Sequence, residues 1–137
     1  MRILKTFSLS AFFISIACAM SLSLASETSA PPRFGKLKGE VVDAGNGRTV
    51  HARVYVTDSR ANHYFDSRAV VFKHRRDNEQ NFSCDGKFEV ELPPGKATVR
   101  VERGLEYKPL TKTVEISSRE IREEKFAIGR WVNMAEK

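Results

Sequence analysis

The chain has 137 residues, of which 41% are hydrophobic, and its formal net charge is +6. This length is enough for one hydrophobic core but short for two, so a single domain is expected. Basic and acidic residues are interspersed, as in Arg119-Glu120-Ile121-Arg122-Glu123-Glu124-Lys125, which favours a solvated surface and argues against a nucleic-acid partner.

Residues 1–25 have the layout of a secretory signal peptide. Arg2 and Lys5 precede an apolar run that reaches Met20, and Ser23-Leu24-Ala25 supplies a small-residue cleavage pattern. We therefore expect cleavage after Ala25, contact with a membrane only during export, and a periplasmic or extracellular location. Residues 26–33 are small, polar and rich in proline, which predicts a flexible linker before a domain that spans residues 34–137.

The chain has two cysteines, Cys18 and Cys84. Cys18 lies in the predicted signal peptide. Lipidation there stays open as an alternative, although Ser15 stands where a lipoprotein signal usually has a larger aliphatic residue. Cys84 then has no partner for an intrachain disulfide, and we interpret it as a small buried apolar residue rather than a nucleophile.

Beyond residue 34, apolar residues alternate with polar ones in six or seven short runs. Turn signals separate the runs at Gly45-Asn46-Gly47, Asp85-Gly86 and Pro93-Pro94-Gly95. The alternation weakens between residues 58 and 81, where residues 73–81 are predicted to form a loop. A final strand is predicted from Lys125 to Met134, after a turn at residues 118–125. This cadence predicts an all-β protein with one small sandwich of about seven strands.

The alternation also predicts which side chains face the core. They are Val41, Val54, Val56, Phe88, Val90, Leu92, Val99, Val101, Val114 and Ile116.

Catalytic and metal-binding motifs are absent from the sequence. His51, His63 and His74 lack the close spacing of metal ligands, and no nucleophile elbow, phosphate-binding loop or dinucleotide fingerprint occurs. We expect no enzymatic activity, no cofactor and no metal from this chain.

Several runs together resemble the carboxypeptidase regulatory-like, transthyretin-type sandwich. They are Gly39-Glu40-Val41-Val42-Asp43, Ala52-Arg53-Val54-Tyr55-Val56, and Asp85-Gly86-Lys87-Phe88 leading to Leu92-Pro93-Pro94-Gly95. This resemblance spans nearly all of residues 35–134 and implies a two-sheet sandwich of immunoglobulin-like type.

Two further runs, Arg103-Gly104-Leu105-Glu106-Tyr107 and Arg130-Trp131-Val132-Asn133-Met134, are narrower. They resemble the N-terminal accessory domain of exported CehA/McbA-type metallohydrolases, whose catalytic domain is of the PHP (polymerase and histidinol phosphatase) type. In that family a metal-binding His-x-His motif follows shortly after this point, whereas this sequence ends at Lys137. The resemblance implies a non-catalytic accessory domain that contacts a metallohydrolase domain or protein, or is truncated from one.

Tryptophan, tyrosine and arginine dominate protein interfaces, which makes the narrower runs the candidate interface. The residues are Arg103, Glu106, Tyr107, Arg130 and Trp131. The alternative is structural: Trp131 as a plug, Tyr107 as a corner residue, and Arg103 with Glu106 as a local ion pair.

Two other functions are conceivable for a domain of this kind. A stand-alone module that binds carbohydrate or cell wall would need a row of exposed aromatic residues, for which Tyr55, Tyr64 and Phe65 are the candidates. A transthyretin-related hydrolase would end in Tyr-Arg-Gly-Ser, and this chain ends differently. No oligomeric state is predicted.

Overall fold

Nine β-strands and no helix make up the part of the chain that the computed structural model describes, residues 33–76 and 78–132. The predicted signal peptide and residues 26–32 of the predicted linker lie outside that part. The strands are β1 (Gly35–Asp43), β2 (Ala52–Asp58), β3 (His63–Tyr64), β4 (Val71–Lys73), β5 (Gln80–Cys84), β6 (Lys87–Leu92), β7 (Gly95–Glu102), β8 (Leu110–Ile116) and β9 (Ile121–Ile128).

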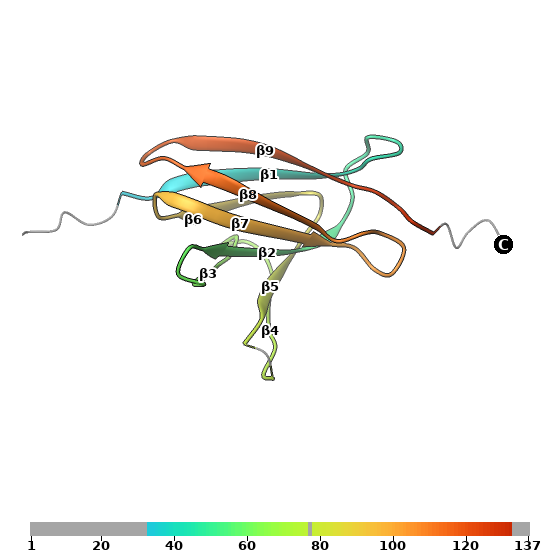
Figure 1. The fold of residues 1–137 in the computed structure, drawn as a ribbon, viewed down its shortest axis with the longest axis horizontal. Helices are drawn as coiled ribbons and strands as arrows, with labels where there is room; N and C mark the ends of the chain where they lie inside the picture. The colour runs from blue at the N-terminus through green and yellow to red at the C-terminus, as the bar shows by residue number, and fades with distance from the viewer. Residues whose placement is uncertain (1–32, 77, 133–137) are drawn as a thin grey trace, which may run out of the picture.

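Two sheets form a sandwich, as Figure 1 shows. One sheet has the order β6-β1-β9, with β1 antiparallel to β6 and parallel to β9. The other has the order β4-β5-β2-β7-β8, and β3 pairs with β2. The prediction of an all-β sandwich is confirmed. The described part holds nine strands rather than about seven, because the weakly alternating region contributes the short strands β3 and β4.

The chain crosses between the sheets at each turn that the sequence marked. β1 and β2, β5 and β6, and β6 and β7 belong to different sheets, so the intervening turns are corners of the sandwich. Glycine suits these corners because Gly47, Gly86 and Gly95 have positive φ angles. The corners place the alternating faces of consecutive strands on opposite sides of one core.

The core lies between the two sheets, and all ten side chains predicted to face it are buried, which confirms the predicted strand faces. Leu37, Phe82, Phe126 and Ile128 complete its centre. The ring centroids of Phe82 and Phe88 lie 5.6 Å apart, and those of Phe88 and Phe126 lie 5.8 Å apart. These three rings therefore link β5 of one sheet to β6 and β9 of the other.

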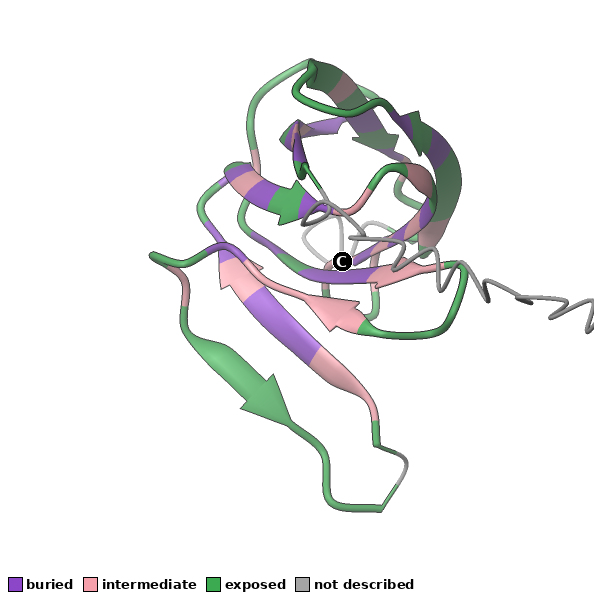
Figure 2. Ribbon diagram, turned by 90° about the vertical axis from the view of Figure 1, so that its left-hand side faces the viewer, coloured by how far each residue is buried: buried purple, intermediate pink, exposed green. Residues whose placement is uncertain are grey.

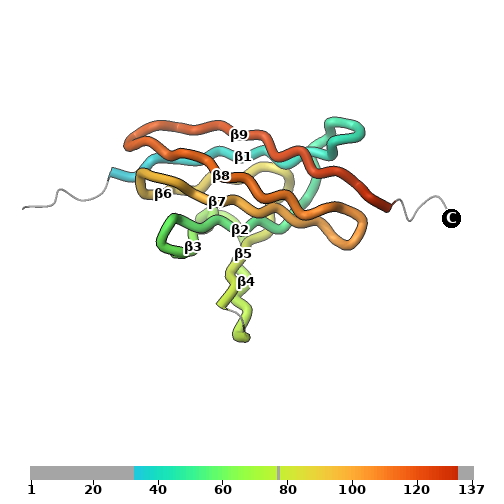
Figure 3. Tube along the Cα trace, in the orientation of Figure 1, coloured from blue at the N-terminus to red at the C-terminus, as the bar shows by residue number. Residues whose placement is uncertain are grey.

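A β-hairpin formed by β4 and β5 projects from the sandwich; we call it the arm (residues 70–83). Figure 2 shows β4 exposed along its length, and Figure 3 shows the arm standing away from the other strands. Phe72 pairs with Asn81 across the hairpin. The sequence predicted a loop at residues 73–81, which is wrong at both ends because pairing extends β4 to Lys73 and starts β5 at Gln80.

The last strand, β9, is four residues earlier than the sequence predicted. It begins at Ile121 instead of Lys125 and ends at Ile128, so the prediction is also wrong for residues 129–132, which are not part of the strand; Met134 lies outside the described residues. The first half of β9 has no apolar alternation, and it forms a strand because it pairs with β1. This pairing runs from Ile121 beside Lys36 to Lys125 beside Glu40. The Glu124 carboxylate accepts hydrogen bonds from Lys112 and Arg122. In this half of β9, ion pairs take the place of the apolar contacts that were used to predict strands from the sequence.

The turn between β2 and β3 is organised by the Asp58 carboxylate. It accepts hydrogen bonds from the Asn62 side chain at 2.9 Å, from the backbone amides of Arg60 and Asn62, and from the Tyr64 hydroxyl at 3.0 Å. These bonds, the Asn62 side chain first among them, lower the pKa of Asp58 from 3.8 to about 2.

A carboxylate whose pKa is lower in the folded state stabilises the fold above its unfolded pKa and loses that contribution as pH falls through its folded pKa. We expect the free energy of unfolding to fall between about pH 4 and pH 2, and Asp58→Asn to remove part of that fall. Urea denaturation across this pH range measures it. Asp85→Asn, in an exposed turn, is the matched control; equal pH profiles for both variants would contradict the assignment.

Candidate functional site

Three of the five sequence-predicted interface residues meet where the chain leaves the sandwich. The Tyr107 hydroxyl donates to Asp43 Oδ2 at 2.7 Å and accepts from Arg130 Nε at 2.6 Å. Arg130 Nε also lies 3.3 Å from Asp43 Oδ2, and its Nη1 lies 4.0 Å from Glu106. The bond from Tyr107, followed by that from the Gly45 amide, lowers the pKa of the buried Asp43 carboxyl. Asp43 and Tyr107 therefore form an anchor that fixes Arg130.

Tyr107 itself is only 4% exposed, so it positions its neighbours and has little surface for a partner. The guanidinium carbons of Arg130 and Arg103 lie 5.0 and 5.3 Å from the centroid of its ring. Arg103 also donates a hydrogen bond of 2.7 Å to the His51 carbonyl. The structure thus brings Arg103 to the same end of the molecule as Tyr107, Arg130 and Glu106. The Tyr107 ring lies beneath the two arginines.

Trp131 is exposed and at the same time fixed in position. Its side chain nitrogen donates to the Leu105 carbonyl at 2.6 Å, and its backbone amide donates to the Glu106 carbonyl at 3.0 Å. Nevertheless, the residue is 63% exposed, Leu105 is 85% exposed, and Val132 is 49% exposed. We call these three residues the exit patch. Figure 3 shows that the chain segment after β9 leaves the sandwich at the end opposite the start of the described chain.

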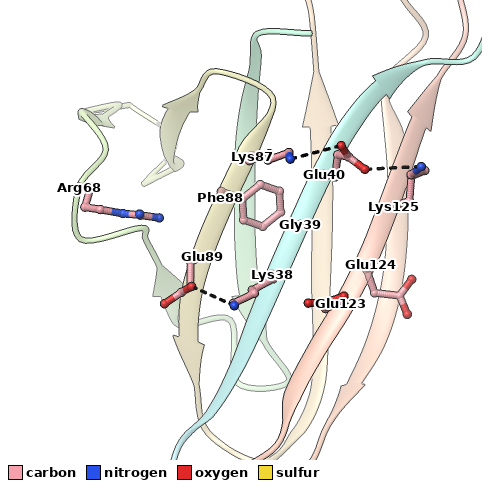
Figure 4. A pocket seen from close by; sticks show the side chains of 10 residues that line it. All are labelled: Lys38, Gly39, Glu40, Arg68, Lys87, Phe88, Glu89, Glu123, Glu124 and Lys125. Atoms are coloured by element: carbon pink, nitrogen blue, oxygen red, sulfur yellow. Dashed lines mark ion pairs between the residues drawn. The ribbon is translucent and has the colours of Figure 1, made fainter. Parts of the chain in front are cut away.

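A first hollow, of about 560 Å³, lies on the outer face of the β6-β1-β9 sheet (Figure 4). Its charged side chains are four basic and four acidic: Lys38, Arg68, Lys87 and Lys125, with Glu40, Glu89, Glu123 and Glu124. Lys38 lies 3.9 Å from Glu89, and Lys87 and Lys125 lie 3.8 and 3.5 Å from Glu40. Because the charges balance and pair across the strands, this hollow has no excess charge to select a ligand.

A second hollow lies on the outer face of the other sheet, between the arm and the loop that joins β7 to β8. It includes a hydrogen bond of 2.9 Å between Ser83 Oγ and His51 Nε2. Asp85 Oδ1 lies 3.8 Å from the same nitrogen. In a catalytic triad the carboxylate binds the other ring nitrogen and orients the histidine, so this group lacks the geometry of an activated nucleophile.

Within residues 33–76 and 78–132, no group of three histidine, cysteine or acidic side chains is placed to hold a metal ion. His51 and His74 both line the second hollow, while His63 belongs to β3. Cys84 is buried, and burial raises the pKa of its thiol. The interpretation of Cys84 as a buried apolar residue is confirmed. Across the same residues, no helix has the length and apolarity to cross a membrane.

The aromatic row considered for a carbohydrate module is not an exposed platform. Tyr55 is buried beneath Arg100, whose guanidinium carbon lies 4.0 Å from its ring centroid, and the Tyr55 hydroxyl bonds to Glu102. Tyr64 and Phe65 are half-buried and pack against the core. The sequence did not point to a site at Phe72 and Arg53. Both residues line the second hollow, and the pairing of β4, β5 and β2 brings them together.

No protein-family model matches this chain, and no curated protein matches its sequence. Solved structures do match its fold. The TIE protein of Bacillus anthracis matches 71% of this chain, with a TM-score of 0.51 and 16% identity. The minor pilin of Streptococcus agalactiae matches 74%, with a TM-score of 0.54 and 12% identity. The pilus 2b backbone protein of group B streptococcus matches 70%, with a TM-score of 0.53 and 12% identity.

These matches cover 17%, 46% and 41% of the three solved chains, so this chain corresponds to a part of each. With identities of 12–16%, the likeness establishes the fold and not an activity. The chain is a β-sandwich domain of the architecture that occurs in pilins.

Proposed function

We propose that the chain is an exported, non-catalytic interaction domain, and that it contacts a catalytic partner through the exit patch. The observation that carries the proposal is the exposed indole of Trp131, held by two hydrogen bonds beside the exposed side chain of Leu105. An aromatic side chain that is already ordered loses little conformational entropy on binding, and tryptophan is the residue type most enriched at energetically important contacts.

The anchor beneath the patch supports this role. Tyr107 and Arg130 form an isolated β-bridge, and the Lys108 amide donates to the Gly129 carbonyl at 2.9 Å. The two segments are therefore held together by backbone as well as side-chain bonds. A rigid base of this kind keeps the apolar residues at the surface instead of letting them fold back onto the core.

The partner that we propose is a PHP-type metallohydrolase domain. The two narrower runs that carry this resemblance, residues 103–107 and 130–134, are far apart in sequence. Their described residues meet at the exit patch and its anchor. The pairing with a metallohydrolase rests on that sequence resemblance, and it implies a periplasmic or extracellular location for both proteins.

The chain contains a single tryptophan, which makes a direct test practical. Incorporation of fluorotryptophan gives one fluorine NMR resonance, from Trp131, to which an unlabelled partner adds nothing. A purified PHP-type catalytic domain from the same genome is expected to shift this resonance and protect it from solvent. Leu105→Ser is expected to weaken binding about ten-fold, since a buried leucine side chain contributes about 1.5 kcal/mol or more.

Val70→Ser is the matched control, because Val70 is an exposed apolar residue on the arm, remote from the patch in sequence and outside it in the structure. It is expected to leave the affinity unchanged. A resonance that stays unshifted and solvent-exposed at saturating concentrations of the catalytic domain would contradict the metallohydrolase pairing. Equal weakening by both substitutions would contradict the exit patch as the contact surface.

A further inference from the structure

The second hollow, which we call the sheet-face hollow, has a volume of about 1020 Å³. Its floor is the outer face of β5, β2 and β7, including Arg53, Asn81 and Ser83. Phe72 on the arm forms one wall, and Leu105 in the loop between β7 and β8 forms the other. Small-molecule sites typically have volumes of about 300–1,000 Å³, so this hollow has room for a ligand of several rings.

Positive charge is in excess in the sheet-face hollow. Arg53 has no ion-pair partner among the described residues, and Arg103 uses one nitrogen to bond the His51 carbonyl. The acidic residue in the hollow is Glu102, which lies 3.2 Å from Arg100 Nε and accepts a hydrogen bond from Tyr55. Arg100 is shared with Glu79, whose Oε1 lies 3.1 Å from Arg100 Nη2. The hollow is lined by two arginines and one acidic residue, so one positive charge is in excess to attract an anion. This imbalance distinguishes the hollow from the balanced one in Figure 4.

The floor also contains a polar group that lacks its hydrogen bond. Asn81 lines the hollow but is only 6% exposed, and its Oδ1 atom is buried without a donor among the described groups. Buried side-chain amides are usually hydrogen-bonded, and a missing bond costs about 1–3 kcal/mol. Rotation of the amide would present either Oδ1 or Nδ2 to a ligand, so a hydroxyl group in the hollow can act as its partner.

The walls are apolar and open to solvent, with Phe72 52% exposed. A sugar ring has an apolar face that packs on an aromatic ring and a rim of hydroxyl groups that bond to amides and hydroxyls. Arginine binds a carboxylate through two parallel hydrogen bonds. A peptide that adds as a strand does not suit this floor, because its backbone groups already pair with neighbouring strands. An acidic peptide held by the arginine side chains is the competing ligand, which the polyglutamate comparison below tests.

We infer that the sheet-face hollow binds a carboxylate-bearing saccharide, with Arg53 pairing the carboxylate, Phe72 packing against a sugar ring and Asn81 bonding a hydroxyl group. This site is separate from the proposed contact at the exit patch, although Leu105 belongs to the rim of both. Trp131 and Val132 do not line the hollow, so the two proposals fail independently.

Calorimetric titration of the purified protein with oligogalacturonate at low ionic strength tests the site. Saturable binding is expected, and Arg53→Met should weaken it about ten-fold or more, the loss expected for a charge-assisted pair of hydrogen bonds. Phe72→Ser should weaken it about five-fold or more. Methyl-esterified oligogalacturonate, which keeps the rings but lacks the charge, should bind at least about ten-fold more weakly.

Two controls match these variants. Arg60→Met removes the same charge from an exposed turn, and Val70→Ser removes an exposed apolar side chain from the same arm; neither residue lines the hollow. Both should leave the affinity within about two-fold, and thermal melts should show all four variants folded. Equal or tighter binding of polyglutamate would overturn the saccharide in favour of an acidic peptide. Unchanged binding by Arg53→Met, or no binding of oligomers of galacturonate, glucuronate or muramate, would overturn the site.

Discussion

Val90→Asp is expected to leave the domain unfolded or to lower its Tm by about 15 °C or more. Val90 lies at the centre of β6, is 1% exposed and faces Leu37 of β1 in the strand register. The substitution removes a buried apolar side chain and places a carboxylate in the core with no partner. These effects together cost about 4 kcal/mol or more, against a total stability of about 5–15 kcal/mol for a domain of this size.

Circular dichroism during heating and urea denaturation measures this loss. Glu91→Asp is the matched control, because it puts an aspartate at the next position of the same strand with its side chain in solvent. That variant should change the free energy of unfolding by less than about 1 kcal/mol. A Val90→Asp protein with an unchanged Tm would show that β6 does not present this face to the core.

Gly39→Ala is expected to destabilise the domain by about 2–3 kcal/mol, although it adds a single methyl group. Gly39 lies in the middle of β1, opposite Phe88 of β6. A Cβ atom at this position would lie 2.0 Å from the end of the Phe88 ring. That ring cannot simply swing away, because it packs against Phe82 and Phe126 in the core. Glycine is therefore required here by the close approach of an aromatic ring.

A double mutant separates this explanation from the general cost of changing a core strand. Phe88→Leu removes the ring atoms that a new Cβ would meet, so Gly39→Ala should cost about 1–2 kcal/mol less in the Phe88→Leu background. Gly129→Ala is the control, since a Cβ atom at residue 129 would have no neighbour within 4 Å, and it should be nearly neutral. Additive free energies for Gly39→Ala and Phe88→Leu would contradict direct contact as the cause.

The faces of the strands could be predicted from the sequence because they depend on local geometry. Successive side chains of a strand point to opposite sides, so the alternation of valines around Val54 and Val99 identified the core without knowledge of any partner strand. The same local signal failed at the start of β9, where Arg122 and Glu124 face ion-pair partners instead of apolar neighbours. It also failed in the arm, where pairing between β4 and β5 extends the strands into polar sequence.

The sequence predicted part of the exit patch and its anchor, and none of the sheet-face hollow. The sequence predicted an interface at Trp131, Arg130 and Tyr107, because these residue types are common there. Only the fold shows that Tyr107 is buried and Trp131 is exposed. Phe72 and Asn81 belong to no motif, and the run that contains Arg53 indicated only the sandwich fold. The pairing of β4, β5 and β2 brings the three residues to one face. The sheet-face hollow could therefore not be predicted from the sequence.

The sequence by itself determined that this protein is an all-β domain, ten of the residues that form its core, and the three turns at residues 45–47, 85–86 and 93–95. The tertiary structure alone decided which sheet each strand joins, because β1 pairs with β9 from the other end of the sequence and neither strand specifies that partner locally. It also decided that Gly39 lies under Phe88 and that Trp131 stays in solvent. The physical reason is that alternation is a property of one strand, whereas pairing, close approach and exposure are properties of several segments packed together.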